Sequence, residues 1–95
     1  MKLMKEVMMF YLESCPYCDM ARRALAELYR ELPGVELRNI QMVEEDDEPD
    51  FAARFDYYAV PTFYLEGKKL FEARPGMGYA EIKAAVRRVL EAALA

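Results

Sequence analysis

Two cysteines stand three positions apart where two sequence patterns meet, and they are the only cysteines in the chain. The segment Cys15-Pro16-Tyr17-Cys18 follows an apolar run at 7–12 and opens a stretch with helical periodicity. This spacing places both thiols in one turn at the start of a helix, where unpaired N–H groups and the helix dipole favour a thiolate. Because the thiolate is the form of cysteine that attacks disulfides, the pattern predicts a redox-active pair.

The residues on either side of this pair predict a strand followed by a helix. Residues 6–12 are apolar on both faces, which is typical of a central strand covered from both sides. Pro16 suits the first turn of the helix because its missing N–H would be unpaired there, and Pro33-Gly34 ends the helix. Apolar side chains recur at helical spacing at Ala21, Ala24, Leu25, Leu28, Tyr29 and Leu32.

A second strand and a short helix are expected in the middle of the chain. The strand spans 35–42 and contains Val35, Leu37 and Ile40. Five consecutive acids at 44–48 complement the dipole of the next helix and supply its N-cap, so we interpret this run as structural. The short helix that follows packs by one face, which consists of Phe51, Ala52 and Phe55.

A hairpin and a helix close the chain. Residues 63–65 and 69–73 pair as antiparallel strands around the turn signal Glu66-Gly67, and the last helix spans 79–93. The expected order is β-α-β-α-β-β-α, a single α/β domain over 1–95 with a four-stranded mixed sheet flanked by helices. The apolar stripe of the last helix consists of Ile82, Val86, Val89 and Ala93.

Composition excludes several classes of function. Thirteen Lys and Arg against seventeen Asp and Glu give a net charge of −4, which disfavours binding to nucleic acid or to an anionic membrane. Without histidine, neither a Cys-His nucleophile pair nor an imidazole zinc site can form, and we expect no metal site. The chain has no apolar run of about 18 residues and no signal-peptide pattern, so we expect no membrane span and a cytoplasmic location.

The order of these motifs resembles the thioredoxin/glutaredoxin superfamily over nearly the whole chain. The Cys-Pro-Tyr-Cys motif, the length and the lack of Trp look like glutaredoxin, whereas residues 55–63 look more like thioredoxin. The second motif that carries the resemblance is Val60-Pro61-Thr62, directly before the late hairpin. The resemblance implies that Pro61 is a cis-proline beside the cysteines and that the backbone of Val60 pairs with an extended thiol substrate.

These positions predict a two-step thiol–disulfide exchange. Cys15 precedes the helix and faces solvent, so it is the expected nucleophile, while Cys18 lies inside the first turn and resolves the mixed disulfide. Pro16 and Tyr17 shape the helix start and the lip of the site, although Tyr17 fits plain packing equally well. Gly76 completes the expected set of substrate-binding residues.

Neither branch of the superfamily fits throughout. Glutaredoxins carry Lys or Arg where this chain has Glu13, Thr where it has Ala59, and an acidic turn residue that is missing from 74–78. Thioredoxins carry a buried Asp where this chain has Met9 and a Trp where it has Ser14. These departures favour protein disulfides over glutathione as substrates.

The leading hypothesis is a monomeric thiol–disulfide oxidoreductase that reduces protein disulfides or glutathione-mixed disulfides and binds no cofactor. Glutathione or a thioredoxin-reductase-type flavoprotein would supply the electrons. The alternative is a thioredoxin-fold adaptor in which Cys15 and Cys18 form a structural disulfide. A third hypothesis, iron–sulfur carriage between two chains, is disfavoured by the two-cysteine motif and the weak glutathione site.

Overall fold

The elements follow the expected β-α-β-α-β-β-α order. The computed structural model describes residues 4–35 and 38–95. Its elements are β1 (Val7–Tyr11), α1 (Pro16–Glu31), β2 (Ile40–Glu44), α2 (Pro49–Ala52), β3 (Thr62–Leu65), β4 (Lys68–Glu72) and α3 (Tyr79–Leu94). The predicted α/β class and element order are therefore confirmed.

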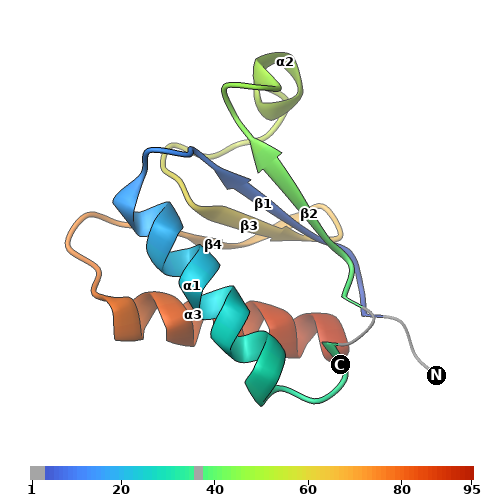
Figure 1. Ribbon diagram of the computed structural model, residues 1–95. Helices are drawn as coiled ribbons and strands as arrows, with labels where there is room; N and C mark the ends of the chain where they lie inside the picture. The colour runs from blue at the N-terminus through green and yellow to red at the C-terminus, as the bar shows by residue number, and fades with distance from the viewer. Residues whose placement is uncertain (1–3, 36–37) are drawn as a thin grey trace.

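The four strands form one mixed sheet in the order β2-β1-β3-β4. β1 pairs in parallel with β2 and antiparallel with β3, and β3 pairs antiparallel with β4. Helices α1 and α3 lie side by side against one face of the sheet, and the short α2 lies beyond the opposite face (Figure 1). Within the described ranges, no helix is long and apolar enough to cross a bilayer.

Strand β1 separates two apolar clusters. Val7 and Met9 belong to the large core formed with α1 and α3, whereas Phe10 belongs to a cluster of aromatic side chains on the other face. This alternation confirms the prediction of a strand covered from both sides, and each buried side chain of this size contributes about 1.5–3 kcal/mol. The aromatic cluster consists of Phe10, Phe51, Phe55, Tyr57 and Tyr64.

The long helices pack through their predicted apolar stripes. Every aliphatic member of both stripes is buried in the large core, and Tyr29 packs against that core while partly buried. At the rim, the Glu27 carboxylate in α1 accepts hydrogen bonds from the Tyr79 hydroxyl at 2.5 Å and from Lys83 Nζ at 2.9 Å, both in α3. A polar seam therefore runs beside the apolar contact between α1 and α3.

The hairpin between β3 and β4 contains one irregularity. Its turn residues Glu66 and Gly67 both have positive φ, 47° and 86°, as the type I′ hairpin turn requires. Phe63 pairs with Phe71, but Tyr64 pairs with Lys69, so Leu70 is an extra residue in β4. A bulge of this kind changes which side chains share a face of the sheet.

The second strand lies later in the chain than predicted. β2 spans Ile40–Glu44 instead of 35–42, and its register pairs Val7 with Ile40 and Tyr11 with Glu44. An acidic residue is tolerated because β2 is an edge strand with solvent-exposed side chains. Val35 instead lies in a helical turn and is buried in the core, and Leu37 lies outside the described residues.

The predicted short helix is also partly wrong. α2 ends at Ala52, so Phe55 lies after the helix, where its ring packs 4.8 Å from that of Phe10. Glu48 occupies the N-cap position, but its side chain makes no capping bond. Pro49 stands at the first helical position, where an N–H would be unpaired, so the helix begins without the predicted cap.

The ends of the other elements differ from the prediction by one or two residues, as helix and strand ends commonly do. The first strand is two residues shorter than 6–12, β3 begins one residue earlier, and β4 spans Lys68–Glu72 instead of 69–73. Leu32 is the C-cap of α1, directly before Pro33-Gly34, and α3 ends at Leu94. None of these shifts moves a predicted site residue to another element.

Candidate active site

Cys15 is the N-cap residue of α1. Its backbone is extended, with φ −93° and ψ 119°, and Pro16 follows at the start of the helix. The Cys15 sulfur accepts a hydrogen bond from the backbone N–H of Cys18 at 3.3 Å. Cys15 is half-buried and so partly accessible to solvent, and one of the unpaired amides of the helix start points at its sulfur.

Cys18 lies inside the first turn of the same helix and is fully buried. Burial raises the pKa of the Cys18 thiol to about 12, and the neighbouring Cys15 thiol adds to the effect. Cys18 therefore carries its proton at neutral pH. The structure thus holds an accessible thiol and a buried neutral thiol one helical turn apart.

A loop from the other half of the chain meets these thiols. The Cys15 sulfur lies 3.6 Å from the carbonyl oxygen of Val60, 45 positions away in sequence. The peptide bond between Val60 and Pro61 is cis. The buried Thr62 hydroxyl donates a hydrogen bond to the carbonyl of Ala59 at 2.6 Å, which fixes the loop one residue before Val60.

Two further predicted site residues, Tyr17 and Gly76, contact each other. The N–H of Gly76 donates a hydrogen bond to the Tyr17 hydroxyl at 2.7 Å, joining positions 59 residues apart. Gly76 has φ 87°, a conformation that favours glycine. Because this N–H has an internal partner, the Gly76 loop is tied to the start of α1 at the edge of the site.

The chain before the cysteines is held by an acidic side chain. The N–H of Glu13 donates to the Glu44 carboxylate at 3.1 Å, and the same carboxylate accepts the N–H of Asp46 at 2.6 Å. Glu44 therefore links the segment before the cysteines to the acidic run after β2. This contact gives one member of the acidic run a structural role.

A surface groove of about 720 Å³ is lined by Leu12 and Val60, two residues that contact Cys15, although neither cysteine belongs to the lining. The Cys15 N–H donates to the Leu12 carbonyl at 3.3 Å, and the Cys15 sulfur faces the Val60 carbonyl. Among the residues described, the lining contains two acids and no Lys or Arg. The complete lining is Leu12, Glu45, Asp46, Pro49, Ala52, Ala53, Phe55, Tyr57, Tyr58, Ala59 and Val60.

Metal binding has no support in the described geometry. Across residues 4–35 and 38–95, no three cysteine or acidic side chains converge as a metal site. The acidic run 44–48 instead uses Glu44 on backbone amides and Glu45 on the hydroxyl of Tyr57, at 2.7 Å.

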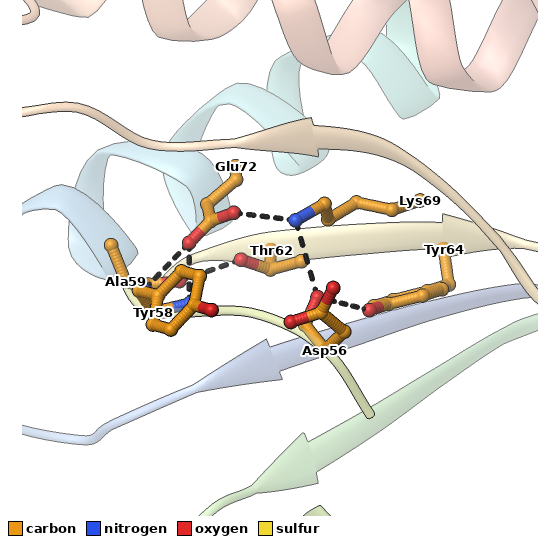
Figure 2. A network of polar contacts seen from close by, with 7 residues as sticks. All are labelled: Asp56, Tyr58, Ala59, Thr62, Tyr64, Lys69 and Glu72. Carbon is orange, nitrogen blue, oxygen red and sulfur yellow. Dashed lines mark hydrogen bonds and ion pairs between the residues drawn. The ribbon is translucent and has the colours of Figure 1, made fainter. Parts of the chain in front are cut away.

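A polar network that the sequence did not predict lies between the Val60 loop, residues 56–60, and β4 (Figure 2). It joins Asp56, Tyr58 and Ala59 in the loop to Lys69 and Glu72 in β4. Lys69 and Glu72 are three positions apart, a spacing that normally places side chains on opposite faces of a strand, so no sequence pattern indicated the network.

The family of the chain follows from sequence comparison. The family model described as "Glutathione S-transferase, N-terminal domain" matches residues 9–88, which include both cysteines and the Val60 loop. The chain belongs to this family. The match and the fold place it in the thioredoxin/glutaredoxin superfamily, as predicted. No curated protein sequence matches the chain.

Solved structures with the same fold include three thioredoxins. Oxidized mitochondrial thioredoxin 3 from Saccharomyces cerevisiae is 23% identical with a TM-score of 0.60, and the match covers 96% of this chain and 80% of that one. A mutant thioredoxin from Halobacterium salinarum NRC-1 is 16% identical with a TM-score of 0.61, covering 98% and 77%. Thioredoxin 1 from Thermosipho africanus TCF52B is 15% identical with a TM-score of 0.57, covering 92% and 96%. At these identities the likeness establishes the fold alone.

Proposed function

We propose that this protein is a dithiol oxidoreductase that reduces disulfide bonds in other proteins. The observation that carries the proposal is the pairing of a half-buried Cys15 with a buried, protonated Cys18 at the start of α1. An attacking thiol needs access to the substrate, whereas a resolving thiol needs only to reach the first sulfur after the mixed disulfide has formed.

The reaction proceeds in two exchanges that move two electrons to the substrate. The Cys15 thiolate attacks one sulfur of the substrate disulfide, so a mixed disulfide forms and the other substrate sulfur leaves as a thiolate that takes a proton. Cys18 then attacks the Cys15 sulfur, and its proton passes to the substrate sulfur that leaves. This step forms the Cys15–Cys18 disulfide and releases the second substrate thiol.

The groove supports a polypeptide substrate. It adjoins Cys15 through Leu12 and Val60 and is lined by alanine and aromatic side chains together with Glu45 and Asp46. A peptide segment can pair its backbone with Val60 while its side chains enter the groove. An anionic tripeptide such as glutathione would meet acidic side chains there, and Glu13 adds another beside the cysteines.

Regeneration of the dithiol requires an electron donor. The name of the matched family makes glutathione one candidate, with two molecules of it oxidised to glutathione disulfide for each turnover. A thioredoxin-reductase-type flavoprotein is the other candidate, and we favour it because the acidic side chains of the groove would oppose anionic glutathione. We place the activity in a reducing compartment such as the cytoplasm, where thiols are kept reduced.

Single cysteine variants test this proposal. In an assay where dithiothreitol regenerates the dithiol, Cys15→Ser should abolish catalysed reduction of insulin disulfides, because no other accessible thiol lies at the helix start. Cys18→Ser should accumulate a mixed disulfide with the substrate, detected by mass spectrometry under non-reducing conditions. Full turnover by the Cys15→Ser variant, or multiple turnovers by Cys18→Ser without a trapped intermediate, would overturn the assignment.

A further inference from the structure

The loop that faces Cys15 is not held by the sheet ladder. Residues 56–60 have no regular secondary structure, and the side chain of Tyr58 is 93% exposed. Even so, the backbone N–H groups of Tyr58 and Ala59 both donate to one oxygen of the Glu72 carboxylate, at 2.5 and 2.8 Å. A single carboxylate therefore fixes two consecutive peptide units directly before Val60.

A second side chain of β4 completes this hold on the loop. Lys69 Nζ donates to the other carboxylate oxygen of Glu72 at 2.8 Å and to the carbonyl of Asp56 at 3.1 Å. The hydroxyl of Tyr64 donates to the same Asp56 carbonyl at 2.7 Å. The two ends of the loop are thus joined through one ion pair (Figure 2).

The bulge in β4 is what makes the ion pair geometrically available. In a regular strand, residues three apart point to opposite faces. Because Leu70 is an extra residue, Lys69 lies opposite Tyr64 and Glu72 lies opposite Thr62. Thr62 and Tyr64 are two positions apart and so share one face of β3. Lys69 and Glu72 therefore point to the same face, which is the face that the loop crosses.

The charge state of the network agrees with this geometry. Burial acts against ionisation of Glu72, but the bonds from Lys69 and from the Tyr58 and Ala59 amides outweigh it and hold the pKa of the carboxyl below its usual value. Glu72 is therefore ionised at neutral pH. An ionised carboxylate accepts stronger hydrogen bonds than a neutral acceptor.

We infer that Glu72, braced by Lys69, is a positioning residue that holds the 56–60 loop so that the Val60 backbone faces Cys15 and its substrate. Neither side chain touches the thiols; both act through the loop. This inference rests on the proposed function for its kinetic test, but its structural test does not.

The structural test is amide hydrogen exchange measured by NMR. In Glu72→Ala, the amides of Tyr58 and Ala59 should exchange on the order of 10-fold faster or more, because their acceptor is gone and the segment opens locally. Glu91→Gln is the matched control, since it neutralises a glutamate that also forms an ion pair, with Arg87 on α3. Unchanged protection at Tyr58 and Ala59 in Glu72→Ala would overturn the inference whether or not the protein is an oxidoreductase.

The kinetic test uses insulin as the disulfide substrate. Glu72→Ala should raise KM on the order of 10-fold, equivalent to about 1.4 kcal/mol of binding, with kcat within about twofold. Glu72→Gln should have a smaller effect, because its amide oxygen can still accept from Tyr58 and Ala59 while the pairing with Lys69 is lost. Lys69→Met should resemble Glu72→Gln, and Lys68→Met, an exposed neighbour, is its control.

The outcomes separate the two proposals. If the wild-type protein does not reduce insulin, the proposed function fails and hydrogen exchange alone decides the positioning role. If the wild type is active and Glu72→Ala keeps its KM, or loses only apparent kcat in proportion to its loss of folded protein by circular dichroism, the positioning role is contradicted.

Discussion

The two halves of the candidate site are held in place by different interactions. The cysteine half begins α1, whose Ala21, Leu25 and Leu28 are buried in the large core. The loop half, residues 56–60, packs Tyr57 and Val60 against the aromatic cluster and also hydrogen-bonds its backbone to side chains of β4. Apolar packing thus fixes the thiols, whereas the segment that faces the substrate depends on polar contacts in addition to packing. Changes in the first half should therefore cost stability, and changes in the second should cost substrate binding.

The largest expected effect follows from removing core packing under the cysteine half. Leu28 is fully buried, so Leu28→Ala should lower the free energy of unfolding by about 2–5 kcal/mol. Activity per folded molecule should change little, because the thiols keep their places in the helix. Urea denaturation measures the loss, and Leu70→Ala, at a leucine that is 39% exposed, is the matched control. A loss equal to that of the control would show that core packing does not hold this half.

A smaller change in stability with a clear change in binding is expected from Thr62→Val. This substitution keeps the side-chain shape but leaves the partly buried Ala59 carbonyl without its donor; a fully buried group would cost about 1–3 kcal/mol, and this one should cost towards the lower end. The KM for insulin should rise several-fold as the loop loosens. Thr62→Ser retains the hydroxyl and should keep a KM near that of the wild type. Equal KM values for the valine and serine variants would contradict a loop held by polar contacts.

The smallest effect is expected at the polar seam between α1 and α3, and it depends on pH. Hydrogen bonds from Tyr79 and Lys83 lower the pKa of Glu27 to about 2. Since this folded-state pKa lies below the ordinary value of 4.5, the stabilisation is present above about pH 4.5 and is lost as the pH falls towards 2. Glu27→Gln should therefore lower the melting temperature slightly at pH 7, and the difference should vanish near pH 2. A difference that persists at pH 2 would mean that packing, not charge, is responsible.

The two halves also differ in how much of their structure could be predicted from the sequence. The cysteine half was predicted well because helical periodicity, the position of Pro16 and the spacing of Cys15 and Cys18 are local signals. The contact of Cys15 with Val60 was anticipated only through a resemblance, since it joins residues 45 positions apart.

The parts that were missed depend on register. The Lys69–Glu72 pair requires a bulge at Leu70, and no local pattern indicates where a hairpin gains an extra residue. The shift of β2 to Ile40–Glu44 has the same origin, because pairing with β1 places the acidic Glu44 inside an edge strand. Local propensity could not reveal either arrangement.

The central claim, that Cys15 and Cys18 exchange electrons with substrates, is tested most directly by a redox titration of the pair against glutathione and dithiothreitol buffers. For an oxidoreductase pair we expect a reduction potential between about −270 mV, as in thioredoxin, and about −200 mV, as in glutaredoxins. A pair that stays oxidised below about −300 mV would behave as a structural disulfide. That result would contradict electron exchange by Cys15 and Cys18 and favour an adaptor whose fold is that of an oxidoreductase.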